Sequence, residues 1–420
     1  MSQRDPKTAP TPTSPGGWPG GVRGAARGAP PVDPSIDDGS AWARLLEDLR
    51  RSGEMVLGAN APAPSLDRAE GWRHLASLLR MGISEMLVDW DPDRPRFQWS
   101  DGTAKWGLDC ADALYAQAPV RAGAVYRMRG NRGSVHFLGI QLVARMRAVA
   151  DLDADELEVD SEGNFELWMG GEPRSGNWVE LPEDATTLIV RQFFYDWDNE
   201  LPASFEIERM DPGERRVAQV VTPGAIARQL AALGAFVHDN TQWWAQVAIA
   251  KRAQANQFPD DQGGLGAVAS AAQKYQAFGI GYFDLACDQA LLIEVTPPPA
   301  KYWSLHLGNY WMESLDYGGA QNSLNGHQAQ IDADGVFRAV ISSRDPGVPN
   351  WLDPGGRSEG SMIYRWNQSP HAPIPAARVV PIGELGKALP PGTPVVTPEE
   401  RQATVERRRE HVRRRLARPV

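Results

Sequence analysis

Residues 163–194 read GNFELWMGGEPRSGNWVELPEDATTLIVRQFF, and residues 335–365 read GVFRAVISSRDPGVPNWLDPGGRSEGSMIYR. Each stretch has a Gly two residues before a Phe, then an Asn-Trp pair, then an Arg 14 or 15 residues after the Asn. The two Asn-Trp pairs begin at Asn177 and Asn350, 173 positions apart. Matching segments at a fixed offset indicate an internal repeat. These stretches therefore predict two similar units.

Two further matches occur at an offset of about 170 in the same order along the chain. They pair Tyr126 and His136-Phe-Leu-Gly with Tyr302 and His306-Leu-Gly, and Asp112-Ala-Leu with Asp288-Gln-Ala-Leu. Three matches in order at a nearly constant offset favour a duplication over chance.

The composition and the local patterns favour short strands. The chain has 420 residues with 41 Gly and 34 Pro, which is rich in turn-forming residues. Turn clusters separate apolar segments that are typical of strands. These segments are VYRMRG (125–130), SVHFLGIQLV (134–143), NFELWM (164–169) and TLIVRQFF (187–194), and strands resume from about residue 281 to 365.

Helices are expected before each group of strands. One begins at Ser40, with Trp42, Leu45, Leu46 and Leu49 on one face. A second has Ser65 as its N-cap and apolar residues at helical spacing, namely Leu66, Ala69, Trp72, Leu75, Leu79, Ile83 and Met86. A third begins at Thr222-Pro223. A fourth begins with a capping box from Thr397 to Glu400.

The resulting fold class is α+β, mostly β. We expect two similar antiparallel β-sandwich lobes, jelly-roll-like, each preceded by helices, plus a C-terminal helix. Residues 1–38 are expected to form a disordered tail, residues 39–215 the N-terminal helix and lobe, residues 216–390 the C-terminal helix and lobe, and residues 391–420 an Arg-rich helix.

Charge and cysteine content limit the class of function. The net charge of -10 argues against a nucleic-acid partner. Cys110 and Cys287 are too few for a disulfide framework, and no signal peptide or membrane span is found, so a cytoplasmic location without membrane association is expected. The terminal helix carries eight Arg and is interpreted as a solvated arm or subunit-docking helix, with an acidic partner or membrane surface as the alternative. A homo-oligomer is left open.

Three stretches resemble a known family, the bacterial proteins that carry the domain of unknown function 1214, often with a related domain 1254. They are residues 109–120 (DCADALYAQAPV), residues 176–200 (GNWVELPEDATTLIVRQFFYDWDNE), and residues 323–353, where SLNGHQAQIDADGVF and DPGVPNWLD stand. The resemblance covers most of residues 65–380 and implies paired β domains, but no assigned activity. Relatives often have Asn-Pro-Asp before the Tyr, whereas this chain has Asp109-Cys110-Ala111-Asp112.

The first candidate site is acidic. Asp109 and Asp112 precede Tyr115, and burial of one carboxyl would raise its pKa and suit it to proton transfer. The alternative is a structural turn in which an Asp caps the loop before the strand.

The second candidate site combines a guanidinium with aromatic rings. Arg191, Phe193 and Tyr195 would share one strand face, where Arg191 could hold a substrate carboxylate and the rings could form an apolar wall. A structural ion pair between Arg191 and Asp196 or Asp198 is the alternative.

The third candidate site lies near His306, Tyr310, Asn325 and His327. His327, oriented by Asn325, could act as a general base. The two histidines have no compact metal-ligand spacing, so no metal is assigned. No nucleotide-binding or serine-hydrolase motif is present, and no cofactor is expected.

Two functions are compatible with these patterns. The first is a cytosolic enzyme that acts by acid-base chemistry on a lipophilic, oxygen-bearing small molecule in an aromatic cleft. It would use Asp112, Tyr115 and His327 as catalytic residues, with Arg191, Tyr195, Asn325, His306 and Tyr310 as substrate-binding residues. The alternative is a small-molecule-binding or complex-subunit protein without turnover.

Overall fold

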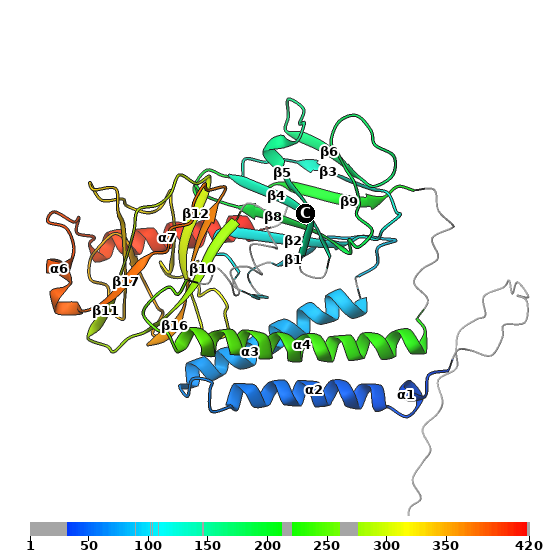
Figure 1. Ribbon diagram of the computed structural model, residues 1–420, viewed down its shortest axis with the longest axis horizontal. Helices are drawn as coiled ribbons and strands as arrows, with labels where there is room; N and C mark the ends of the chain where they lie inside the picture. Colours follow the sequence, from blue (N-terminus) through cyan, green and yellow to red (C-terminus); the bar gives the residue numbers. More distant parts are fainter. Residues whose placement is uncertain are drawn as a thin grey trace, which may run out of the picture.

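The computed structural model describes residues 32–88, 90–100, 102, 104–107, 109–144, 147–211, 221–260 and 276–417. Two β lobes lie side by side, and helices α1 to α4 form a layer along one side of both (Figure 1). The expected α+β class with two similar, mostly antiparallel lobes and a C-terminal helix is confirmed. The expected tail lies mostly outside the described residues, but its last part is a short helix, α1 (Pro34–Asp37), capped by Asp33.

The N-terminal lobe contains two sheets. One has the order β1-β2-β8-β4-β5 and the other β7-β6-β3-β9. The strands are β1 (Gln98–Ser100), β2 (Ala113–Pro119), β3 (Tyr126–Asn131), β4 (Phe137–Ala144), β5 (Arg147–Asp153), β6 (Asn164–Met169), β7 (Trp178–Val179), β8 (Thr187–Phe193) and β9 (Ser204–Arg209). The predicted strands at 125–130, 134–143, 164–169 and 187–194 are therefore confirmed.

The C-terminal lobe repeats this arrangement. Its sheets have the orders β10-β16-β12-β13 and β15-β14-β11-β17. The strands are β10 (Gln276–Asp284), β11 (Gln289–Val295), β12 (Tyr302–Gly308), β13 (Ser323–Asn325), β14 (Phe337–Ser342), β15 (Trp351–Leu352), β16 (Glu359–Asn367) and β17 (Ala376–Pro381). Each strand from β2 to β9 thus has a counterpart in sequence order from β10 to β17, and both lobes contain one parallel pair, β6 with β7 and β14 with β15.

The two Asn-Trp pairs make the same hydrogen bonds in both lobes. The side chain of Asn177 donates to the carbonyls of Glu158 and Glu166 and accepts from the backbone N–H of Glu158. Asn350 makes the same three bonds with the backbones of Gln330 and Arg338. Both side chains therefore tie a loop to a strand, which is the structural role expected for an Asn in this position.

The paired Trp residues differ in burial. The indole N–H donates to a backbone carbonyl in each lobe, from Trp178 to Gly170 and from Trp351 to Ser342, both at 3.1 Å. Trp351 is buried, whereas Trp178 is half-buried. The Trp ring therefore belongs to the core only in the C-terminal lobe.

One of the three sequence matches joins equivalent strands only in part, and another does not join them at all. Tyr126 lies on β3 and Tyr302 on β12, which are not counterparts, but Phe137-Leu-Gly and His306-Leu-Gly of the same match lie on the counterpart strands β4 and β12. Asp112 precedes β2 and Asp288 precedes β11, which are not counterparts either. The Asn-Trp match, in contrast, places the same side chain against the same loop and strand in each lobe.

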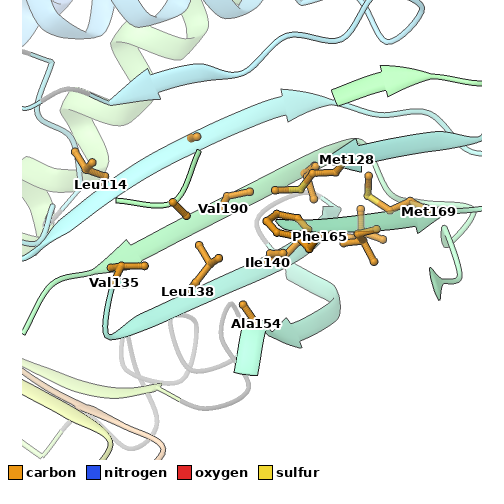
Figure 2. Close-up of a cluster of buried hydrophobic side chains, with 14 of the residues drawn as sticks. Leu114, Met128, Val135, Leu138, Ile140, Ala154, Phe165, Met169 and Val190 are labelled. Carbon is orange, nitrogen blue, oxygen red and sulfur yellow. The ribbon is translucent and has the colours of Figure 1, made fainter. Parts of the chain in front are cut away.

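The interior of the N-terminal lobe is apolar. The side chains between its two sheets include Leu114, Met128, Leu138, Phe165 and Val190, each nearly out of contact with solvent (Figure 2). The C-terminal lobe has a corresponding core around Leu291, Phe337 and Trp366. Alternation of side chains along each strand directs one face of each sheet into these cores.

The helical layer packs mainly on itself. It comprises α2 (Ser40–Leu57), α3 (Ser65–Ile83), the π-helical turn η1 (Ser84–Val88) and α4 (Pro223–Arg252). Leu45, Leu78, Leu233 and Val237 form its buried centre. The three long helices begin within one residue of the predicted starts, although α3 is capped at Pro64 rather than Ser65. None of the helices that the structure describes is long and apolar enough to cross a bilayer.

The faces predicted for α2 and α3 are partly wrong. Leu45 is buried, but Trp42 and Leu46 are about half exposed, and so are Leu66 and Trp72 on α3. The buried face of α3 instead carries polar residues, which contact the C-terminal lobe. His74 Nδ1 lies 2.8 Å from the Glu313 carboxylate, Glu70 pairs with Arg357, and the Trp311 N–H donates to the Asp67 carbonyl.

The C-terminal helix α7 (Pro398–Leu416) spans both lobes and follows the short helix α6 (Leu385–Ala388). Its predicted capping box is present. Arg408 donates to the carbonyls of Tyr317 and Ser323 in the C-terminal lobe, and Arg415 donates to the carbonyl of Ala111 in the N-terminal lobe. The helix is therefore not a solvated arm, because its buried face docks on its own chain.

Candidate functional site between the lobes

Two sheet faces from different lobes meet at a polar seam. Side chains of β2, β8, β4 and β5 that point away from the N-terminal core face side chains of β10, β16 and β12. Ring centroids of Phe193 and Tyr302 lie 5.0 Å apart, and Lys301 pairs with Asp153 at 3.2 Å. The seam holds Arg191 near the middle of β8 and Arg365 near the middle of β16, its counterpart strand.

Asp112 fastens the two lobes to each other. Its carboxylate accepts hydrogen bonds from Trp197 of the same lobe at 2.8 Å, and from Tyr302 and Asn325 of the other lobe at 2.6 and 3.0 Å. The side chain is fully buried, and burial raises the pKa of its carboxyl, although the Tyr302 hydroxyl and the cations of Arg415 and Arg408 act in the opposite direction. Because donors occupy both oxygens, the geometry is that of a structural joint.

Asp109 also reaches across the seam. Its carboxylate accepts from the backbone N–H and the hydroxyl of Ser314, at 2.9 and 2.6 Å. The acidic pair before Tyr115 is thus divided between two separate contacts with the C-terminal lobe, and each contact adds to the attachment between lobes.

A cavity in the seam is lined by Arg191. Its other walls are Phe137, Gly139, Gln141 and Asp151 from the N-terminal lobe, and Gln276 and Asn367 from the C-terminal lobe. The space available to the centre of a water molecule is about 20 Å³. About 10–15 Å³ of such space accommodates one water molecule, so the cavity has room for roughly two, or for the head of a small molecule.

The Arg191 guanidinium lacks partners at two nitrogens. Nε and Nη1 are both shielded from solvent, and neither has a hydrogen-bond partner among the described residues. Burial lowers the pKa of the guanidinium, with Tyr115 and Asp151 acting in the opposite direction. The alternative, an ion pair of Arg191 with Asp196 or Asp198, is not found among the described residues. The Asp196 carboxylate instead contacts Asn199, His327 and the backbone N–H of Asp198.

Tyr115 is the cross-strand neighbour of Arg191 on the same sheet face. Such directly paired residues have Cβ atoms roughly 5 Å apart. The Tyr115 hydroxyl accepts from the backbone N–H of Cys110 at 3.2 Å, and burial raises the pKa of the phenol. Tyr115 and Arg191 therefore lie side by side on β2 and β8, although Tyr115 does not line the cavity described above.

His306 lies elsewhere in the seam, beside Arg365. An Arg365 nitrogen lies 3.0 Å from His306 Nδ1, and burial lowers the pKa of the imidazole well below its usual value, with the Arg365 cation acting in the same direction. The ring is consequently neutral, and it accepts a hydrogen bond from Arg365.

His327 and Tyr195 form a separate group near the surface. His327 is half exposed, and its Nε2 lies 3.7 Å from the Asp196 carboxylate. Tyr195 stacks on His136 with centroids 4.6 Å apart, and its carbonyl accepts from Asn325 at 3.1 Å. His327 does not line the Arg191 cavity, so Asp112, Tyr115 and His327 do not meet there.

Tyr310 lies away from this group. It is buried with Trp311 and Val56 beside the helical layer, and burial raises the pKa of its hydroxyl to about 12. Among the described residues, no three or more His, Cys, Asp or Glu side chains are grouped as metal ligands. The two histidines weighed for a metal have separate partners, Arg365 and Asp196.

Four residues of the site were not found from the sequence. Tyr302 and Trp197 donate to Asp112, and Gln276 and Asn367 line the cavity. Gln276 and Asn367 are directly paired on β10 and β16, but no motif in the sequence links two residues 91 positions apart. Their role depends on how the lobes meet, which local patterns do not report.

The comparisons with known proteins find relatives without an assigned activity. The family model described as protein of unknown function DUF1214 matches residues 281–370. A crystal structure of an uncharacterised protein from Burkholderia cenocepacia is 34% identical, covers 83% of this chain and 99% of its own, and superposes with a TM-score of 0.77.

A more distant match is the VPA0106 protein from Vibrio parahaemolyticus, which is 12% identical, covers 82% of this chain and 100% of its own, and has a TM-score of 0.44. No curated protein matches the chain. The family match lies over the strands that form one wall of the seam, and the Burkholderia relative extends the similarity over most of the chain. The chain therefore belongs to the DUF1214 family of proteins of unknown function.

Proposed function

We propose that this protein binds a small molecule with a carboxylate in the seam between its lobes, without turning it over. The observation that carries the proposal is the Arg191 guanidinium, whose Nε and Nη1 are buried beside a cavity without partners among the described residues. Buried charged groups are normally paired, because an unpaired one loses its hydration and gains nothing in return. A ligand carboxylate would supply that pairing.

The size of the cavity limits the ligand. A cavity volume of about 20 Å³ suits a molecule with few heavy atoms, such as a two- or three-carbon acid. Phe137 provides an apolar wall, and the rings of Tyr115, Phe193 and Tyr302 adjoin it in one cluster. An acid with a short chain would fit beside this wall, whereas the larger lipophilic molecule expected from the sequence would not.

The acid-base enzyme is the second candidate, and Tyr115 is the residue that favours it. Its pairing with Arg191 would place a phenol beside a bound carboxylate. The binding protein is better supported, because a general base must reach its proton directly or through one water. Asp112 is enclosed by three donors and His327 is half exposed beside Asp196, so neither lines the cavity.

Thermal unfolding in the presence of small acids tests the proposal. Propionate at about ten times its Kd should raise the Tm of the full chain by about 2 °C, because a ligand that binds only the folded state stabilises it. Arg191→Met should abolish this rise. Arg129→Met removes the same charge from an exposed strand position and should preserve it.

Three outcomes bear on this test. A rise in Tm in both variants would show that the acid binds elsewhere, which contradicts the proposal. The proposal is also contradicted if no two- or three-carbon acid raises the Tm of the wild-type chain. A rise accompanied by consumption of the acid would favour the enzyme, and Tyr115→Phe would then identify the phenol as a participant if it removed turnover and left binding intact.

The remaining sequence-based expectations belong to this proposal. A duplication is supported by the one-to-one order of strands and by the matched bonds of Asn177 and Asn350. A cytoplasmic location is supported by Cys110 and Cys287, which are both free thiols. Cell fractionation and light scattering would test the location and the homo-oligomer, respectively.

A further inference from the structure

We propose that the ligand of the seam carries a hydrogen-bond donor, an amino or hydroxyl group, on the carbon next to its carboxylate. This inference rests on the proposed function, because it takes Arg191 as the carboxylate site. It identifies the ligand class as short α-amino or α-hydroxy acids and assigns Gln276 and Asn367 as the residues that select it.

The C-terminal lobe contributes two unpartnered acceptors. Gln276 and Asn367 face each other as the first pair of β10 and β16, and they are 7% and 2% exposed. The side-chain oxygens Gln276 Oε1 and Asn367 Oδ1 are shielded from solvent and have no hydrogen-bond partner among the described residues. Both residues line the cavity that Arg191 lines from the opposite lobe.

The charge on the opposite wall is consistent with a donor on the ligand. Asp151 lines the same cavity, and its carboxylate accepts from Gln141 at 2.9 Å. The walls therefore offer one cation, Arg191, together with a carboxylate and two amide oxygens. A simple carboxylate would satisfy Arg191 and leave the acceptors facing an apolar or like-charged group, which is costly in a buried site.

A ligand with both groups satisfies both walls at once. Its carboxylate would pair with Arg191 of the N-terminal lobe, and its amino or hydroxyl hydrogens would be donated to Gln276 or Asn367 of the C-terminal lobe. Both groups must lie on neighbouring atoms, because the cavity has room for few heavy atoms. Such a molecule would contact both lobes and would therefore stabilise the attachment between them.

Three nearly isosteric acids test the inference by calorimetric titration of the full chain. Propionate, glycolate and glycine differ only in a methyl, hydroxyl or ammonium group on the carbon next to the carboxylate. Glycolate or glycine should bind at least about tenfold more tightly than propionate, since a donor that meets buried acceptors typically contributes this much. Equal or tighter binding of propionate would overturn the inference.

This comparison separates the inference from the proposed function. If all three acids bind equally and Arg191→Met abolishes binding, the proposed function stands and the donor preference is wrong. If none binds, both are wrong. The wild-type comparison requires no variant, so it decides the matter even if a substitution prevents folding.

Matched variants locate the preference. Gln276→Met and Asn367→Leu keep roughly the same side-chain volume and remove the acceptor, so they should reduce the preference for glycolate or glycine over propionate to less than about threefold. Binding of propionate should persist in both. Gln402→Met changes an exposed amide on α7 and should leave the preference intact. A preference that survives in both cavity variants would overturn the assignment of Gln276 and Asn367.

Discussion

The interior of the N-terminal lobe and the seam between the lobes are both buried, but the first is lined by apolar side chains and the second contains many polar ones. Between the sheets of the lobe lie Leu, Met, Ile, Val and Phe side chains (Figure 2). In the seam lie Asp112, Arg191, His306, Gln276 and Asn367. Apolar packing stabilises with little dependence on direction, whereas buried polar groups require specific partners.

The lobe interior and the seam therefore have different structural roles. The lobe cores hold each sandwich together, and the polar joints of the seam fix how the sandwiches meet. Asp112 and Asp109 pair with most of the polar groups of the seam. Arg191, Gln276 and Asn367 keep buried polar atoms without a partner among the described residues, and these atoms are available to bind a ligand.

The largest effect is expected when the seam joint is removed. Asp112→Ala removes the buried carboxylate that accepts from Trp197, Tyr302 and Asn325, and breaking a buried charged network typically costs about 3–5 kcal/mol. Urea unfolding should report this loss in the free energy of unfolding. Asp198→Ala, at an exposed position next to Trp197, should cost less than about 0.5 kcal/mol. A loss below about 1 kcal/mol for Asp112→Ala would show that the joint is dispensable.

A core substitution should cost somewhat less and should behave differently. Leu167→Ala creates a cavity in the N-terminal lobe, and such changes cost about 2–5 kcal/mol. The same urea experiment measures the loss. Small acids should not restore stability selectively in this variant, because the cavity is apolar; selective rescue by propionate would contradict the separation of the two regions.

A third buried environment lies between the helical layer and the first sheet. The Glu85 carboxylate, on the π-helical turn η1, accepts a hydrogen bond from Gln117, and burial raises its pKa to about 7. The folded chain then binds more protons than the unfolded chain between about pH 4.5 and 7. Stability from this group is therefore present at low pH and is lost as the pH rises through 7.

Glu85→Gln tests that assignment. The variant should be more stable than the wild-type chain at pH 8 by up to about 3 kcal/mol, and this advantage should shrink toward pH 5. Thermal unfolding across this range measures the difference between the two chains. A difference that is constant with pH would mean that Glu85 titrates in its ordinary range.

The smallest effect concerns Arg191 in the absence of ligand. Arg191→Met replaces an incompletely paired buried cation with an apolar side chain, and we expect a gain of about 1 kcal/mol in the free energy of unfolding. Arg129→Met should change it by less than about 0.5 kcal/mol. A loss of stability in Arg191→Met would indicate that Arg191 forms a structural ion pair instead of a binding site.

Much of the fold could be predicted because it depends on local patterns. Turn residues and apolar segments identified strands β3, β4, β6 and β8, and Asn-Trp identified equivalent loops. The buried face of α3 could not be predicted in this way. Its His74 and Glu70 are buried because Glu313 and Arg357 pair with them from more than 230 residues away, which overrides the apolar spacing of Leu66 and Trp72.

The candidate site shows the same limit. Arg191 and Tyr115 could be proposed because their residue types and strand positions suit a polar site, and the register of β2 with β8 places them side by side. Gln276 and Asn367 became visible only when the lobes were placed against each other. The docking of α7 was missed for the same reason, since its arginines bind backbone carbonyls, which leave no sequence signal.

A crystal structure determined in the presence of propionate tests the binding site most directly. The account predicts a carboxylate in the seam, with an oxygen within about 3 Å of a guanidinium nitrogen of Arg191. A structure in which Arg191 instead forms a closed ion pair with Asp151, and propionate occupies no position in the seam, would contradict it.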